Sequence, residues 1–380
     1  MKEGKPQQQS EKDESTNLNK DPRNVVYERP ILDREHSHEA VESLERDFKD
    51  FYSSRGYSEH EPVLISSGAD PSVRFIGSHI SVFKPYLLTD TVPTPGYFIV
   101  QDCVRTQNMK RIFDDEYSPR WGSFFTSLGT ISPASRLDEV CDESLHFLKE
   151  KINIENNDIR VRVNSKDEDL LKASRNVFPE DSLEIDTQQD SYYRHKIGID
   201  GVWGRNFNLA LRNANGEGFA DVGNVILIEN NEKKLGAELA LGATTILKQV
   251  YNLEHVNDFY PVVGLPQIDP KISRKLEDAI IVSVTLSREG LEPNASDNRG
   301  RILRTYMRSL IYLRERAGLS IGKVEYALKQ FERKQFVTDD PSASNGITEY
   351  LKGYEQELLS KGAKTPEDKL ILSVLNKSPN

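Results

Sequence analysis

The sequence has little cysteine and no long apolar run, and both absences narrow what the chain can be. Cys103 and Cys141 are the only cysteines among 380 residues, too few for a disulfide framework or a cysteine zinc cluster. No apolar stretch approaches the roughly 18 residues that a membrane-spanning helix needs. The first residues lack the apolar stretch of a secretion signal and are too acidic for a transit peptide. We therefore expect a cytoplasmic protein without a targeting signal.

Several common catalytic motifs are also missing. The sequence has no GxxxxGK[ST] phosphate loop, no HExxH zinc motif and no GxSxG nucleophile elbow. The seven His residues are scattered, and none lies at ligand spacing from a second His or Cys. We expect no metal site built from protein ligands.

The composition that remains is that of a globular protein with a net charge of −10, 37% hydrophobic and 29% charged residues. An acidic chain does not coat nucleic acid through bulk charge, although it can carry a local basic face. A chain of 380 residues suggests two domains, because single cores stop growing near ~250–300 residues.

The pattern along the chain predicts three regions. Residues 1–36 are rich in Lys, Glu, Gln, Ser and Asn and should form a disordered tail. Residues 37–265 should form one domain, and residues 266–380 turn mostly helical. Helices and strands in 37–265 do not alternate strictly, which favours an antiparallel or mixed sheet flanked by helices. The expected class is α+β, with a C-terminal helical domain.

Within the first domain, helical periodicity begins after residue 37, and strands are expected at 97–105, 120–132 and 219–230. The small residues of 239–252 predict a closely packed helix. In the second region, the strongest helices are expected at 299–318, 346–362 and 365–376.

The hairpin expected at 97–132 carries the first functional signal. Its outgoing strand ends in Arg105, its loop holds Lys110 and Arg111, and its returning strand carries Arg120 and Phe124. Guanidinium groups bind phosphate oxygens bidentately, and an aromatic ring can stack on a base. The segment is therefore either a nucleotide-binding hairpin or a surface hairpin with solvated charges.

A basic helix carries the second signal. Arg301, Arg304 and Arg308 share one helical face, with Arg314 a further step along. Such a stripe either follows a phosphate backbone or forms a solvated face paired with nearby acids.

Taken in order, these segments resemble alanyl-tRNA synthetase, a class II aminoacyl-tRNA synthetase. DPSVRFIGSHISVFKPYLL resembles the first class II motif, and CVR followed by RWGSFFTSLGTIS resembles the second. GVWGRNFNL and ADVGNVILIE resemble two stretches of the amino-acid site, and DNRGRILRTYMRSLIYLRERAG resembles a helix of the tRNA-recognition region. The resemblance is collinear over residues 40–365 and implies an antiparallel sheet with flanking helices, followed by a helical domain.

The resemblance implies ATP-dependent activation of an amino acid, with Mg²⁺, and transfer to tRNA. Arg105 would be the catalytic contact to the α-phosphate, Arg120 would lie near the terminal phosphates, and Phe124 would lie against adenine. Lys110 and Arg111 would then supply further positive charge in the ATP site. The residues implied for alanine or a small analogue are Asn208, Asn224 and Glu238, and those implied for tRNA are Asn298, Arg301, Arg304 and Arg308.

The sequence departs from the family at the third motif. The family's DTGMGLER ends in an Arg that clamps ATP, whereas the matching stretch here is ELALGATT. Glu238 stands where the family has an Asp for the substrate amino group, and Thr244 or Thr245 stands at the Arg position. A hydroxyl cannot replace a guanidinium on a phosphate, and losing that contact costs about 2–4 kcal/mol of transition-state stabilisation.

Three hypotheses follow from the sequence. The chain is a functional ligase that forms an aminoacyl adenylate, for tRNA or another acceptor. It is instead a non-catalytic paralogue that serves as a binding or regulatory subunit. The third hypothesis is a tRNA-binding protein without chemistry.

Overall fold

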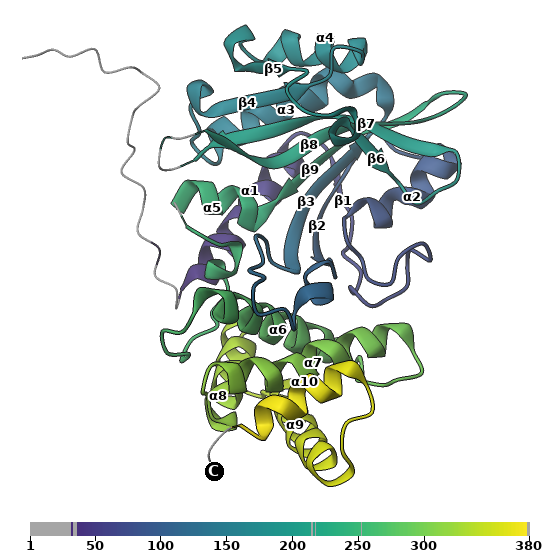
Figure 1. Ribbon diagram of the computed structural model, residues 1–380. Helices are drawn as coiled ribbons and strands as arrows, with labels where there is room; N and C mark the ends of the chain where they lie inside the picture. The colour runs from purple at the N-terminus through teal and green to yellow at the C-terminus, as the bar shows by residue number, and fades with distance from the viewer. Residues whose placement is uncertain (1–31, 33–35, 214–215, 217, 252, 378–380) are drawn as a thin grey trace, which may run out of the picture.

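The computed structural model describes residues 32, 36–213, 216, 218–251 and 253–377. A mixed sheet with its helices forms the upper part in Figure 1, and a group of helices forms the lower part. The predicted disordered tail lies outside the described residues, apart from Leu32 and His36.

Nine strands form one sheet in the order β1-β2-β3-β9-β8-β7-β4-β5, with β6 paired to β7. Only β1 with β2 and β4 with β5 pair in parallel among the described strands. The strands are β1 Ser58–Glu59, β2 Tyr97–Val104, β3 Phe124–Ser132, β4 Ile159–Val163, β5 Leu183–Ile185, β6 Arg194–Lys196, β7 Val202–Arg212, β8 Phe219–Asn230 and β9 Lys234–Gly242. The predicted α+β class, with a mainly antiparallel sheet, is confirmed.

Helices cover the two faces of the sheet unequally. One face packs against α1 (Ser37–Ser54), α3 (Leu137–Glu150), α4 (Glu168–Val177) and α5 (Ala243–Tyr251) in the largest hydrophobic cluster. The other face packs against α2 (Ile80–Thr89) over a smaller cluster. Side chains on a strand alternate between faces, so the part of the second face that α2 leaves uncovered is open to build a site.

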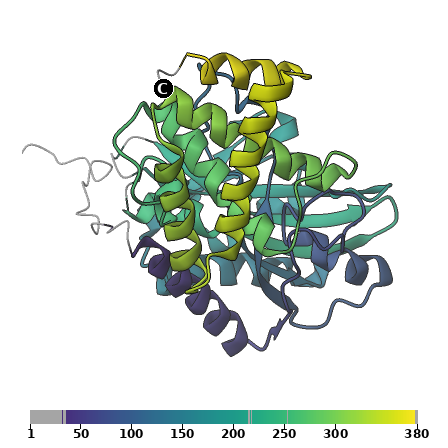
Figure 2. The ribbon, with the colours of Figure 1, turned by 90° about the horizontal axis from the view of Figure 1, so that it is seen from below.

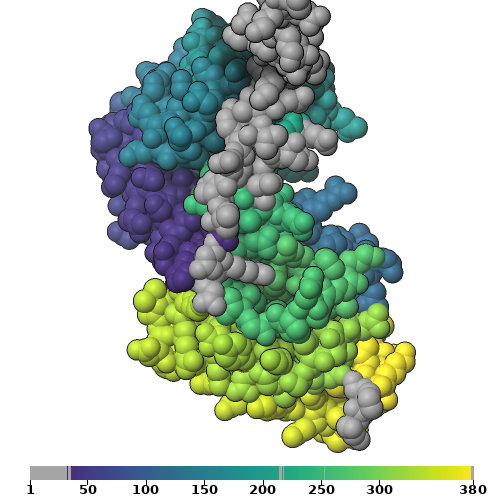
Figure 3. Space-filling model, turned by 90° about the vertical axis from the view of Figure 1, so that its left-hand side faces the viewer, coloured from purple at the N-terminus to yellow at the C-terminus, as the bar shows by residue number. Residues whose placement is uncertain are grey.

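The helical part consists of α6 (Pro270–Arg288), α7 (Asn298–Arg316), α8 (Ile321–Gln335), α9 (Ser342–Lys361) and α10 (Pro366–Leu375). Figure 2 shows these helices from below, and Figure 3 shows them as the lower layer of the molecule. They share a second core with residues of β2 and β3, among them Val104 and Phe124. The predicted boundary near residue 265 stays a prediction, and α6 begins at Pro270 after the capping side chain of Asp269.

The helix predicted from residue 239 begins later than expected. Residues up to Gly242 belong to β9, and α5 begins only at Ala243. Leu239 and Leu241 are buried in the main core, whereas Ala240 and Gly242 face the opposite side of the sheet. This period of two is that of a strand, and the short apolar run of small residues hid it.

The loop between β2 and β3 is fastened to the helical part. Asp278 of α6 accepts hydrogen bonds from the backbone N–H of Ser123 (2.6 Å), from the Ser123 hydroxyl (2.6 Å) and from Asn108 Nδ2 (3.2 Å). Tyr306 of α7 donates to Ser123 Oγ at 3.0 Å, and Lys275 Nζ donates to the carbonyl oxygen of Asp114 at 2.6 Å. Both ends of the loop therefore depend on α6.

Asp278→Asn should make stability less sensitive to pH. Burial raises the pKa of Asp278 to about 6, above its unfolded value. The contribution of Asp278 to the free energy of unfolding is therefore full below about pH 4 and is lost as the pH rises through about 6. Between these values the Asn variant should gain ~1–3 kcal/mol relative to the unmodified chain. Urea denaturation at pH 4, 5, 6 and 7 measures this difference, and parallel profiles for the two proteins would contradict the assignment.

Candidate functional site

A cavity of about 500 Å³ lies over the open part of the sheet, between the ends of β2 and β3 and the β6–β7 hairpin. Its wall takes residues from five strands and from the start of α5. The lining residues of β3 are Phe125 and Ser127, and those of β9 are Ala240, Leu241 and Gly242. This face of the sheet carries small and polar side chains where the opposite face carries the core.

Arg105 lies at the cavity. It follows the last residue of β2, and its Nε donates to the carbonyl oxygen of Gly77 at 2.9 Å. Its guanidinium carbon lies 4.7 Å from the centre of the Phe125 ring. The contact is a cation–π interaction that orients the guanidinium at the cavity wall.

Phe124 does not lie at the cavity, and its expected contact with adenine is corrected. Its ring is buried on the opposite face of the sheet, 5.3 Å from the ring of Tyr260, in the core shared with α6 and α7. Phe125, the next residue, lines the cavity instead. Because strand residues alternate between faces, only one of two consecutive phenylalanines can face the same side as Arg105.

The other cations expected at the ATP site do not reach the cavity in this structure. Lys110, Arg111 and Arg120 are exposed and are not among the residues lining it. Arg111 forms an ion pair with Asp114 at 2.6 Å. Among the lining residues, all within the described part of the chain, Arg105 is the only Lys or Arg.

Thr244 and Thr245, in the first turn of α5, both line the cavity. The sequence resemblance matched one of these two positions to the third-motif Arg, and both side chains here are neutral.

The residues expected in the amino-acid pocket lie on three adjacent strands. Asn208 of β7 pairs opposite Asn224 of β8, and Asn224 pairs opposite Ala240 of β9. Asn208 and Asn224 line the cavity. Glu238, two residues before Ala240, lies on the same face but beneath the floor, with 1% of its surface exposed.

A buried pair that the sequence analysis missed holds Glu238. His79 Nε2 lies 2.9 Å from Glu238 Oε1, and His79 Nδ1 lies 2.8 Å from Ser127 Oγ. Gly129 makes room for the imidazole, because a Cβ there would lie 2.1 Å from the ring. One carboxylate oxygen is therefore fixed, and a lone His in the sequence gave no sign of it.

Several buried polar atoms at or beneath this end of the cavity have no hydrogen-bond partner among the described residues. They include Glu238 Oε2 and Asn206 Oδ1, whose residues do not line the cavity, and His195 Nε2, whose residue does. Leaving such an atom unsatisfied costs about 1–3 kcal/mol. The arrangement is that of a site completed by a ligand or by water.

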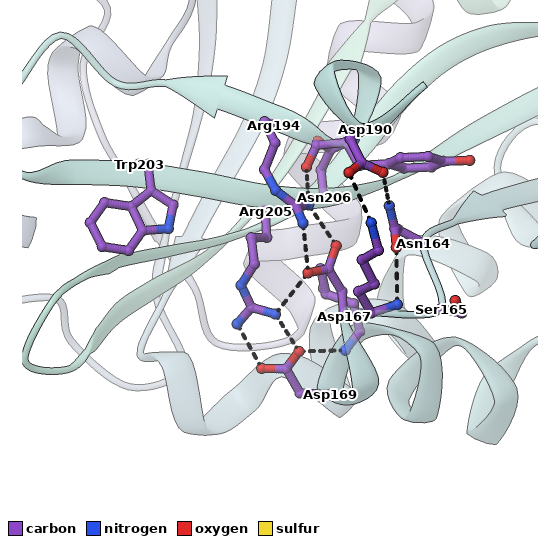
Figure 4. A network of polar contacts seen from close by, with 12 residues as sticks. Asn164, Ser165, Asp167, Asp169, Asp190, Arg194, Trp203, Arg205 and Asn206 are labelled. Carbon is purple, nitrogen blue, oxygen red and sulfur yellow. Dashed lines mark hydrogen bonds and ion pairs between the residues drawn. The ribbon is translucent and has the colours of Figure 1, made fainter. Parts of the chain in front are cut away.

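A network of ion pairs on the other side of β7 stiffens the strands that carry these residues (Figure 4). Arg205 contacts Asp169 at 2.7 Å and Glu229 at 2.6 Å, and Arg194 contacts Asp167 at 2.6 Å. Burial raises the pKa of Asp169, but hydrogen bonds from Arg205 and Lys234 outweigh burial and hold the pKa below its ordinary value. The β6–β7 hairpin is therefore a rigid wall of the cavity.

The residues expected to face tRNA do not form one exposed stripe. Asn298 and Arg301 are exposed at the start of α7, and Arg301 donates to Asn298 Oδ1. Arg304 is half-buried beside a separate hollow of about 380 Å³ near Tyr354.

Arg308 is corrected from a candidate tRNA contact to a structural residue. Its Nη1 lies 3.1 Å from Asp368 Oδ1, and its guanidinium carbon lies 4.3 Å from the centre of the Tyr354 ring. Its side chain is only 12% exposed. The reason is that α10 packs against α7 at this point and supplies the carboxylate, which the Arg spacing on α7 could not reveal.

Comparisons with known proteins add a distant likeness. No protein-family model matches the chain, and no curated protein matches it. A putative threonyl-tRNA synthetase from Aeropyrum pernix is 14% identical over 64% of this chain and 68% of its own, with a TM-score of 0.40. A pyrrolysyl-tRNA synthetase from Desulfitobacterium hafniense is 9% identical over 57% of this chain and 71% of its own, with a TM-score of 0.36.

An asparaginyl-tRNA synthetase from Pyrococcus horikoshii is 9% identical over 60% of this chain and 67% of its own, with a TM-score of 0.37. The chain is thus distantly similar to catalytic domains of class II aminoacyl-tRNA synthetases. At these identities and TM-scores, function has to be argued from the cavity.

Two further properties of the described residues bear on function. No helix among them is both long and apolar enough to cross a membrane. No group of three or more His, Cys, Asp or Glu side chains among them could hold a metal ion.

Proposed function

We propose that the cavity binds an amino acid and ATP, and that the chain joins them as an aminoacyl adenylate, with tRNA as a candidate acceptor. The observation that carries the proposal is one cavity with a guanidinium on a phenyl ring at one end and a buried carboxylate beneath its floor at the other. An adenylate has the matching features, a phosphate next to a base and an ammonium group.

Arg105 and Phe125 support the nucleotide end. A guanidinium at the end of β2 can donate two parallel hydrogen bonds to phosphate oxygens and stabilise charge that develops on the α-phosphate. The Phe125 ring offers an apolar surface at the same wall.

Glu238 supports the amino-acid end. Its Oε1 is held by His79, whereas its Oε2 has no hydrogen-bond partner among the described residues. A carboxylate in a buried site attracts an ammonium far more strongly than one in water. The neighbouring amides of Asn208 and Asn224 can take the remaining polar atoms of a bound amino acid.

The supply of positive charge favours a second candidate, a binding or regulatory subunit without catalysis. Arg105 is the single Lys or Arg among the cavity-lining residues, and Thr244 and Thr245 stand at the position of a missing guanidinium. A triphosphate carries several negative charges, and one guanidinium offsets them only in part. In this second candidate function, the chain binds an amino acid but does not form an adenylate.

Amino-acid-dependent exchange of pyrophosphate into ATP separates the two candidates. The full chain, assayed with each of the twenty amino acids, should catalyse exchange with at least one of them, and Arg105→Ala should lower that rate ~10²–10³-fold. Arg120→Ala is the matched control, because this exposed Arg is not at the cavity, and it should retain most of the rate. Silence with all amino acids, together with no heat of ATP binding by calorimetry, would remove the catalytic proposal.

A further inference from the structure

The strand order of the sheet determines where the groups proposed to bind the phosphate, the ammonium and the amino-acid side chain lie along the cavity. Arg105 and Phe125 belong to the β2–β3 side, Asn224 to β8, Asn208 to β7 and His195 to β6, and all of them line the cavity. Glu238 of β9 lies beneath the floor. Neighbouring strands lie about 4.8 Å apart. A ligand with its phosphate at β2–β3 and its ammonium at β9 therefore directs its remaining group, the amino-acid side chain, towards β7 and β6.

The β7–β6 end of the cavity is polar and is not satisfied by the protein. Asn208 lines the cavity, and its Oδ1 accepts a hydrogen bond at 3.1 Å from Nδ2 of Asn206, which is fully buried and does not line the cavity. His195 Nε2 is likewise buried and without a partner in this part of the chain. Burial lowers the pKa of His195, so the imidazole is neutral at pH 7 and can donate or accept at Nε2.

The charges around this end exclude a charged side chain. An anionic side chain would lie beside Glu238, with no Lys or Arg among the cavity-lining residues of β6, β7 or β8. A cationic side chain would need an ion pair with Asp221. This carboxylate already contacts Arg162 at 2.6 Å and accepts a hydrogen bond from Tyr192 Oη at 2.6 Å. An apolar side chain would leave His195 Nε2 without a partner and would face the polar amide of Asn208.

We infer that the amino acid bound by this chain has an uncharged polar side chain, a hydroxyl or a carboxamide, and is not alanine. The inference rests on the proposed function and names its substrate class. Asn208 and His195, which both line the cavity, are the specificity-determining residues, and Asn206 orients the amide of Asn208. A hydroxyl or a carboxamide both donates and accepts, which suits an amide oxygen next to an imidazole nitrogen. A site built around such buried groups discriminates strongly against an analogue that lacks the polar atom.

Calorimetric titration of the full chain with alanine, serine, threonine, asparagine, glutamine, aspartate and lysine tests the inference. At least one hydroxyl or carboxamide amino acid should bind about 10-fold or more tightly than alanine, since each unsatisfied buried group is worth about this factor. Serine and threonine against asparagine and glutamine then distinguish the two polar groups. Alanine binding as tightly as any of these four, or tight binding of aspartate or lysine, would overturn the inference and leave the proposed function standing.

Absence of binding by every amino acid would instead overturn the proposed function, and the inference with it. Asn208→Leu should remove the preference over alanine while alanine still binds. Asn164→Ala is the matched control, because Asn164 is a buried Asn within the network of Figure 4 and is not at the cavity. Circular dichroism checks that both variants fold, and the comparison of ligands on the unmodified chain decides the question if either does not.

Discussion

Replacing Glu238 by Gln should lower the affinity of the chain for its amino acid about 100-fold. The carboxylate is 1% exposed and has one oxygen fixed by His79. In the proposed function, its second oxygen and its charge bind the ammonium group of the amino acid. Removing one partner of a buried charge pair costs ~2–5 kcal/mol, and the Gln variant keeps the shape of the side chain. Calorimetric titration with the best-binding amino acid measures the change.

Asp142→Asn is the matched control for this variant. Asp142 also lies close to a His, with His146 Nδ1 at 3.4 Å, but both side chains are exposed on α3. The control should bind the amino acid as the unmodified chain does. Equal affinity of the Glu238 variant and the control would show that the ammonium is held elsewhere, and the assignment of the cavity's two ends would fall.

Arg308→Ala should lower the free energy of unfolding by about 3 kcal/mol. The ion pair with Asp368 joins α7 to α10 with both side chains nearly buried, at 12% and 6% exposed. Removing one member of such a pair leaves the other charge buried without its counterion. Tyr354 Oη and the backbone N–H of Thr365 still donate to Asp368, which keeps the cost near the lower end of the usual range. Urea denaturation followed by circular dichroism measures it.

Arg301→Ala provides the comparison, because Arg301 is exposed on the same helix. Its loss should change the free energy of unfolding by less than about 0.5 kcal/mol. Equal effects of the two substitutions would contradict the structural role of Arg308. Any loss of tRNA affinity in Arg308→Ala has to be separated from this loss of stability, so Arg301 and Arg304 are the better positions at which to test tRNA binding.

Much of the fold could be predicted because its signals are local. The helical face of α1 and the strands β2, β3 and β8 follow from the spacing of apolar residues. The start of α5 could not be placed, because Leu239–Gly242 combine apolar and small residues that suit either period. The tertiary contacts of Leu239 and Leu241 with the main core decide in favour of a strand.

Residues of the cavity could be predicted from the sequence only where one strand and its end contain the residues that indicate a binding site. Arg105 was found because it ends a strand, but the adjacent Phe124 was assigned to the wrong face, and the parity of the β2–β3 register would have favoured Phe125. His79, His195 and Asn206 come from α2's leading turn, β6 and β7, and only the strand order brings them near Glu238. Arg308 was misjudged for the same reason, since its partner lies 60 residues away on α10.

The attachment of the β2–β3 loop to α6 has a consequence for how the cavity keeps its shape. Trp121 and Gly122 line the cavity and directly precede Ser123, which Asp278 holds by two hydrogen bonds. No residue of α6–α10 lines the cavity itself. A shortened chain that stops before Pro270 would therefore retain every side chain that lines the cavity. It would still lose the two hydrogen bonds from Ser123 to Asp278 that hold the adjacent Trp121 and Gly122 in place. The helical part α6–α10 therefore helps to fix the shape of the cavity without contributing a side chain to its lining.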